Sequence, residues 1–301
     1  MNANTTGAVL AVLMLDLKSS AFLQILMKAK KSMLVLLGFV LAISLSFNAY
    51  SQKLPKVQYS GIRAPSNIKI DGKVTEWNDQ FQAYNPINRI YYIISNDDEN
   101  LYLAIRTGDG GSGEKAIFGI TFNLQLPGEN GKSSRKNINI RYPKTVEVQK
   151  SGSIRNAVNA VKRIKDDTSG TGKKTMDSLR HFANQKMKDI FKEIDVTGIK
   201  DIKDASISEY NIEGIRVAAQ FDQHMQYTYE LELPLKYLGS NINNKQKFKY
   251  NIKMNGLPEK APGSPFAPPV IYADRTNFMA PEAAFLMYPT DFSGEYSLAK
   301  K

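Results

Sequence analysis

Acidic side chains gather in two short stretches of the chain where they could hold a metal ion. Asp71 and Glu76 lie in the first stretch, and Asp97 and Asp98 are adjacent in the second. Carboxylate oxygens are the donors that Ca²⁺ prefers, so the sequence permits a structural calcium site at these four residues. The alternative needs no metal, because Asp side chains in such sequences stabilise turns by bonding the local backbone. We favour the turn interpretation and predict no other cofactor.

Residue types that commonly carry out catalysis are scarce. The chain has no cysteine and two histidines, His181 and His224, whose separation fits no metal-binding motif. It contains no Gly-x-Ser-x-Gly element and no phosphate-binding glycine loop. We therefore predict a protein that is not an enzyme. A glycan-active enzyme is the remote alternative, because the paired carboxylates of a glycosidase need not be close in sequence.

A proline-rich segment near the C-terminus, residues 256–281, holds the aromatic residues considered for ligand binding. It contains six prolines and few apolar residues at regular spacing. Long loops of this kind in a compact domain are usually either functional or disordered. The candidates for ligand contact are Phe266, Tyr272, Arg275 and Phe278. The alternative is that the aromatic rings pin the loop to the core, in which case they would be buried.

Alternation of apolar and polar residues predicts a mainly antiparallel β structure. The alternation is faultless in 120–126, 227–233 and 248–254, so one face of each strand would be buried and the other solvated. Two further strands, 89–95 and 101–106, flank a turn-forming Asn-Asp-Asp-Glu-Asn sequence and predict a hairpin. Weaker strand patterns cover 138–141, 146–149, 215–221 and 284–287. Short strands between turn signals are typical of a β-sandwich.

One segment, about 153–196, has helical periodicity instead. Apolar residues recur at helical spacing from Ile154 to Ile164 and again from Met176 to Ile194, with a Ser-Gly-Thr-Gly linker between the two runs. Each predicted helix has an apolar stripe that must be covered. One face or edge of the sandwich is the preferred surface, and a partner protein is the alternative.

The N-terminal residues have the pattern of an export signal. A basic stretch at 28–31 precedes the apolar run 33–47, which Ala49 and Ser51 follow as small residues at the positions a signal peptidase reads. We predict a signal peptide over 27–51, cleaved near Ser51–Gln52, and a periplasmic or extracellular domain over 52–301. Residues 1–26 are interpreted as a start assigned too far upstream. An uncleaved membrane anchor is the alternative.

Composition limits the partners. The formal charge is +11, and residues 1–51 carry four lysines and one aspartate, so their removal would leave +8. Such an excess can attract nucleic acid or anionic polymers. The lysines are scattered singly, however, and export also argues against nucleic acid. Without cysteine the chain has neither a disulfide nor a lipid-anchoring thiol. We expect membrane contact only through an uncleaved leader, and the oligomeric state is left open.

Three segments together resemble family-nine carbohydrate-binding modules. Residues 68–77 are similar to the Ile-Asp-Gly…Glu-Trp opening of these modules, 97–103 to their Asp-x-x-x-Leu-Tyr turn and strand, and 229–238 to a late Tyr-Glu-x-x-Ile-Pro-Leu strand. Dopamine-monooxygenase N-terminal-like domains, which bind sugars or haem, have the same β-sandwich plan. The resemblance covers about 68–126 and 205–298. It implies an antiparallel β-sandwich, jelly-roll or immunoglobulin-like, into which the two helices are inserted.

The resemblance also implies a glycan as the first candidate ligand. Modules of this group hold a sugar between exposed aromatic rings, usually tryptophans. The single tryptophan here, Trp77, lies in the fold-defining segment and is predicted to anchor the core. We therefore expect an exported, non-catalytic binding protein. The alternative is a structural or interaction protein of the cell envelope that docks a partner on the helical insertion.

Overall fold

The computed structural model describes residues 28, 30–33, 53–108, 111–127, 136–144, 148–164, 167, 169–239, 242, 247–257 and 281–300. The chain divides into two units, 1–53 and 54–301, and each is considered by itself. In the first unit, residues 28 and 30–33 are described as helical, and most of the predicted signal peptide lies outside the described residues. Among the described helices, none combines the length and the apolarity that crossing a bilayer requires.

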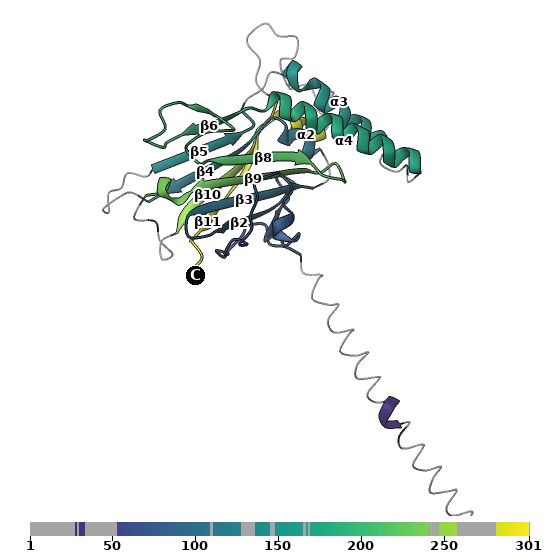
Figure 1. Ribbon diagram of the computed structural model, residues 1–301, viewed down its shortest axis with the longest axis horizontal. Helices are drawn as coiled ribbons and strands as arrows, with labels where there is room; N and C mark the ends of the chain where they lie inside the picture. The colour runs from purple at the N-terminus through teal and green to yellow at the C-terminus, as the bar shows by residue number, and fades with distance from the viewer. Residues whose placement is uncertain are drawn as a thin grey trace, which may run out of the picture. The chain divides into compact units, whose positions relative to one another are not determined.

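Two antiparallel sheets form the second unit (Figure 1). The strands of the five-stranded sheet are, in spatial order, β1 (Ala83–Asn85), β2 (Ile90–Asn96), β3 (Asn100–Thr107), β9 (Tyr227–Pro234) and β8 (Arg216–Phe221). Those of the six-stranded sheet are β11 (Thr290–Tyr296), β10 (Phe248–Met254), β4 (Ile120–Leu126), β5 (Lys136–Tyr142), β6 (Glu193–Thr197) and β7 (Ser206–Ser208). The predicted β-sandwich is confirmed.

Alternating side chains of both sheets make the main core. Tyr229 and Leu231 from one sheet and Phe122 and Ile252 from the other belong to a single buried cluster. The hydroxyl groups of Tyr92 and Tyr250 meet across it at 2.9 Å. Because tyrosine needs a partner for its hydroxyl when it is buried, this pair joins the two sheets without leaving either oxygen unpaired.

A second, smaller core covers the outer face of the five-stranded sheet. The covering segment, residues 54–82, contains the 3₁₀ helix η2 (Thr75–Trp77). Trp77 is 4% exposed and packs with Val74, Phe81, Ile93 and Tyr102. Its indole nitrogen donates to the Ser95 hydroxyl. The prediction that Trp77 anchors the core is therefore confirmed.

Two long helices, α3 (Val148–Ile164) and α4 (Gly170–Ile190), pack together at one side of the sandwich (Figure 1). Their apolar residues Ile154, Ala157, Ala183 and Met187 belong to the main core, as the sequence predicts. Asn184 of α4 also bonds the edge strand β8: its amide nitrogen donates to the Phe221 carbonyl, and its amide oxygen accepts from the Phe221 N–H. The shorter helices are α2 (Ser112–Ala116), η4 (Leu235–Tyr237) and α5 (Pro281–Met287).

Several predicted boundaries in the helical region are wrong. Ile194 lies in β6 rather than in the second helix, because Ile194 and Val196 alternate inward in a short strand. The Ser-Gly-Thr-Gly linker begins α4, since the Ser169 hydroxyl accepts from the Gly172 N–H as an N-cap. The insertion therefore contains α3 and α4 over 148–190, not 153–196.

Two weak strand predictions are also wrong. Residues 284–287 belong to α5, which begins with Pro281 at a position that suits proline because the missing N–H is unpaired there in any helix. Of the predicted strand 146–149, residues 148 and 149 lie in α3, and 146 and 147 lie outside the described residues.

Candidate ligand-binding site

A tight turn between β8 and β9, residues 222–226, lies between two pockets. The Asp222 carboxylate accepts hydrogen bonds from the backbone N–H groups of His224 and Gln226. The backbones of Asp222 and Gln226 also bond each other. An aspartate that bonds the backbone beyond itself is the usual local device for fixing a turn. The β8–β9 turn therefore holds the residues that line both pockets in one conformation.

The first cavity, here called the polar pocket, has a volume of about 370 Å³. The covering segment contributes its 73–79 stretch, β3 contributes Arg106, α4 contributes Arg180, and the turn contributes Asp222 and His224. Gln220, Gln223, Thr75 and Thr228 complete the polar lining. Side chains that donate and side chains that accept hydrogen bonds thus line the same cavity.

The two arginines of the polar pocket are held in place by neighbours. Arg106 forms an ion pair with Asp79, and its guanidinium carbon lies 4.7 Å from the centre of the Phe81 ring. Arg180 bonds Asp177 one turn earlier in α4, at 3.0 Å. A guanidinium has five N–H donors, so each arginine keeps donors beyond these single carboxylate contacts.

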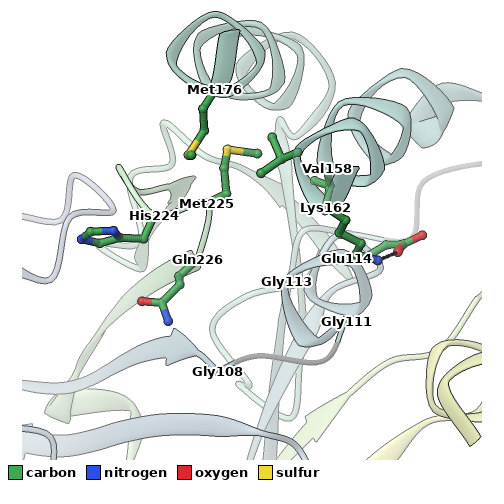
Figure 2. A pocket seen from close by; sticks show the side chains of 11 residues that line it. Gly108, Gly111, Gly113, Glu114, Val158, Lys162, Met176, His224, Met225 and Gln226 are labelled. Atoms are coloured by element: carbon green, nitrogen blue, oxygen red, sulfur yellow. Dashed lines mark hydrogen bonds and ion pairs between the residues drawn. The ribbon is translucent and has the colours of Figure 1, made fainter. Parts of the chain in front are cut away.

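The second cavity, here called the methionine pocket, has a volume of about 310 Å³. Figure 2 shows the side chains of Met176 from α4 and Met225 from the turn pointing toward each other, with Val158 of α3 beside them. Val161 adds to this apolar wall, and Gly108, Gly111 and Gly113 lie on the opposite side. The His224 ring points away from the methionines (Figure 2), and His224 lines the polar pocket as well.

One boundary of the methionine pocket is a buried ion pair on α2. The Glu114 side chain is 3% exposed and accepts from Lys162 Nζ at 2.9 Å and from Arg155 Nε at 3.2 Å. The Asn159 amide lies 3.4 Å from the same carboxylate. A buried carboxylate without such partners would destabilise the folded protein. The contacts from α3 therefore compensate the charge of Glu114 and hold α2 against α3.

The adjacent residue of α2, Lys115, is buried as well and points to the C-terminal part of the chain. Its ammonium donates to the Tyr288 carbonyl and the Thr290 hydroxyl, both at 2.8 Å, and lies over the Phe285 ring. Burial, together with the nearby charge of Arg89, lowers the pKa of Lys115 to about 8. α2 is thus anchored on one side to α3 and on the other to α5 and β11.

A buried carboxyl group, Glu230 of β9, fastens the covering segment to the five-stranded sheet. Its Oε2 accepts from the backbone N–H groups of Asp71 and Gly72, at 3.0 and 2.6 Å. Gly72 has φ +84°, and a Cβ there would lie 3.1 Å from the Ala219 backbone, so glycine is required at this close approach. Burial raises the pKa of Glu230 to about 7, although the two N–H donors oppose the shift.

The four acidic residues considered for calcium lie in two places and have other partners. Asp71 forms an ion pair with Lys73, and Asp98 forms one with Arg63. Asp97 accepts from the Glu99 and Asn100 N–H groups and from the Tyr102 hydroxyl, as expected of a turn residue. Glu76 accepts from the Thr75 hydroxyl. In the described part of the chain, no three His, Cys, Asp or Glu side chains form a group that could hold a metal ion.

The candidates for ligand contact in the proline-rich segment, Phe266, Tyr272, Arg275 and Phe278, lie outside the described residues. His181 is exposed on α4, on its polar side. Among the described residues that the sequence analysis considered for catalysis or metal binding, His224 lines both pockets. The chain matches no family model, no curated protein and no solved structure.

The residues that line the pockets are those that sequence reasoning missed. They come from positions 73–79, 106–114, 158–180 and 220–228, which no motif connects. One local signal was available: the Asp-Gln-His-Met-Gln sequence between two alternating strands predicts a tight turn headed by aspartate. The helix positions gave no such signal, because valine and methionine at helical spacing are the ordinary pattern of a core.

Proposed function

We propose that this protein is an exported, non-catalytic binding protein of the cell envelope whose ligand is a saccharide bound at the polar pocket. The observation that carries the proposal is the lining of this pocket, where arginine, aspartate, glutamine, threonine and histidine side chains surround one cavity of about 370 Å³. A sugar hydroxyl both donates and accepts hydrogen bonds. A lining that offers donors and acceptors side by side therefore suits a polyhydroxylated ligand.

The preformed geometry of the pocket supports binding. Arg106 is fixed between Asp79 and the Phe81 and Tyr91 rings, and the Asp222 turn is held by its own backbone bonds. Groups that are held in place before the ligand arrives lose little conformational freedom on binding. The resemblance of 68–77, 97–103 and 229–238 to carbohydrate-binding modules points to the same ligand class, since Lys73, Thr75 and Asp79 lie in or beside the first of these segments.

A binding role fits the carboxylates that line the two pockets better than a hydrolytic one. Glu114 is engaged by two cations, Asp79 by Arg106, and Asp222 by the backbone of its turn. A general acid needs a carboxyl group that is free to exchange its proton with the substrate. Each of these three carboxylates instead already has a partner within the protein.

The test is a glycan-array screen of the purified protein, followed by calorimetric titration of the best saccharide. Arg180→Ala should weaken binding about tenfold or more, because a lost hydrogen bond from a charged donor costs roughly 1.5–3 kcal/mol. Arg216→Ala is the matched control, since Arg216 is an exposed arginine of β8 that pairs with Glu232 and lines neither pocket. It should leave affinity within about twofold. An empty array, or equal effects of the two variants, would overturn the proposal.

A further inference from the structure

Residues of the β8–β9 turn line both the polar pocket and the methionine pocket, and His224 belongs to the lining of both. We propose that the ligand is a saccharide with an apolar substituent, an alkyl or acyl chain, and that the methionine pocket holds this substituent. The inference rests on the saccharide function proposed above, and it adds a second site and a narrower ligand class to it.

The lining of the methionine pocket suits a flexible hydrocarbon chain. Met176, Met225, Val158 and Val161 form its apolar wall. Methionine is unbranched and polarisable, so it adapts to chains of different length and shape. The volume of about 310 Å³ is within the range of small-molecule sites.

Glu114 lines the methionine pocket, but its charge does not require a charged ligand. The Glu114 carboxylate already accepts from Arg155, Asn159 and Lys162. A ligand cation would have to displace one of these partners. A neutral chain can lie against the methionines and leave the ion pairs intact.

Backbone strain at Met225 is the second observation. Met225 has φ +56°, in the left-handed region that glycine, asparagine and aspartate usually occupy. Such a conformation is unfavourable for a residue with a side chain, because Cβ lies too close to the following carbonyl oxygen. A strained residue persists where the surroundings hold it, often at ligand sites. Here the strained turn directs a methionine side chain toward Met176 (Figure 2).

The experiment follows methionine methyl signals by NMR in protein labelled with ¹³C at these methyl groups. Signals are assigned with Met→Leu variants, and the probes are 1-hexanol and the methyl, butyl and hexyl β-glucopyranosides. We expect 1-hexanol and hexyl glucoside to shift the Met176 and Met225 signals. Met187 and Met254, which are buried in the core, are internal controls whose signals should not move. Affinity should rise about threefold to fourfold for each added methylene, as for other buried CH₂ groups.

A variant separates binding from folding. Met225→Gly removes one wall of the pocket and relieves the left-handed strain, so it should fold and should bind hexyl glucoside at least tenfold more weakly. If Met225→Gly binds hexyl glucoside as the wild type does, the inference is overturned. The same holds if neither 1-hexanol nor hexyl glucoside shifts the Met176 and Met225 signals, whatever the glycan array shows.

Failure of the proposed saccharide function can be distinguished from failure of the methionine pocket to bind an apolar chain. In that case 1-hexanol shifts the two methionine signals, the array is empty, and hexyl glucoside binds no better than 1-hexanol. Such a result would leave an apolar pocket but would overturn the substituted saccharide as its ligand.

Discussion

The outer faces of the two sheets differ in what covers them. On the five-stranded sheet, residues 54–82 bury an apolar surface that includes Trp77, Phe81 and Tyr102. The outer face of the six-stranded sheet instead presents amide and hydroxyl side chains, with Asn123 bonding Asn251 across β4 and β10 at 2.8 Å. Asn251 in turn bonds Asp291 and Ser293 of β11. The outer face of the five-stranded sheet is therefore part of a second core, whereas the outer face of the six-stranded sheet faces solvent.

The comparison shows where a binding site can form on this sandwich. The polar pocket lies where the covering segment meets β8 and α4, so part of its wall is the segment itself. Side chains there are held on several sides and need not move to meet a ligand. The amide network of the open face satisfies its own hydrogen bonds and is hydrated, which leaves less to gain from a ligand.

The largest expected effect is that of Trp77→Ala. Removing a buried indole leaves a cavity under the covering segment and should lower the free energy of unfolding by about 3–5 kcal/mol. Urea unfolding measures the change. The control is Ile212→Ala, because Ile212 is 98% exposed, and it should be neutral within about 0.5 kcal/mol. A small effect of Trp77→Ala would mean that the covering segment contributes little to the fold.

The second-largest effect is expected for Glu230, whose carboxyl group is buried beneath the covering segment. The pKa of Glu230 is raised from 4.5 to about 7 in the folded protein, so the folded state binds more protons between these two values. Stability from this group is therefore present below pH 4.5 and is lost as the pH rises to about 7. At about 1.4 kcal/mol per pKa unit, the loss is at most about 3 kcal/mol.

The variant Glu230→Gln should remove this contribution, because the amide oxygen can still accept from Asp71 and Gly72 but does not ionise. Urea unfolding at several pH values from 4.5 to 8 should give a flatter profile for the variant than for the wild type. Glu232→Gln is the control on the same strand and face. The pKa of Glu232 is raised by burial as well, but this group is more exposed and pairs with Arg216. An equal change of profile in both variants would contradict the assignment to Glu230.

The smallest effect is expected on the open face. Asn251→Ala deletes the bonds to Asn123, Asp291 and Ser293, but water can replace them at a partly exposed site. The free energy of unfolding should fall by less than about 1 kcal/mol, measured in urea beside Trp77→Ala. A loss as large as that of Trp77→Ala would show that the amide network, and not the buried cover, stabilises its sheet.

The long strands of the sandwich could be predicted because apolar and polar residues alternate along each of them. Residues 120–126, 227–233 and 248–254 alternate without interruption, and the structure places them in β4, β9 and β10. The predicted solvated face is wrong for 227–233, because residues 54–82 cover the outer face of β9 and leave Thr228 and Glu230 buried. The short edge strands β1 and β7 have three residues each, too few for a period to appear. The run at 284–287 is apolar throughout, and such a short run is compatible with a strand or a helix until its neighbours are known.

The candidate site could not be predicted, for a different reason. Val158 and Met176 have the spacing of core residues, and Val158 belongs to the main core as well as to the wall of the methionine pocket. Whether a given apolar position meets the core or a cavity depends on how the helices approach the β8–β9 turn. That arrangement is set by contacts such as Asn184 with Phe221, which join residues far apart in the chain. No local pattern encodes it.

The contact between Asn184 and Phe221 also bears on self-association. An edge strand displays unpaired backbone N–H and carbonyl groups, and another chain can extend the sheet by pairing with them. Asn184 occupies both backbone groups of Phe221 on the edge strand β8. At Phe221, the helical insertion therefore blocks the pairing of another strand with this edge. A chain from which α3 and α4 were deleted would be prone to aggregate through β8, in addition to losing its pockets.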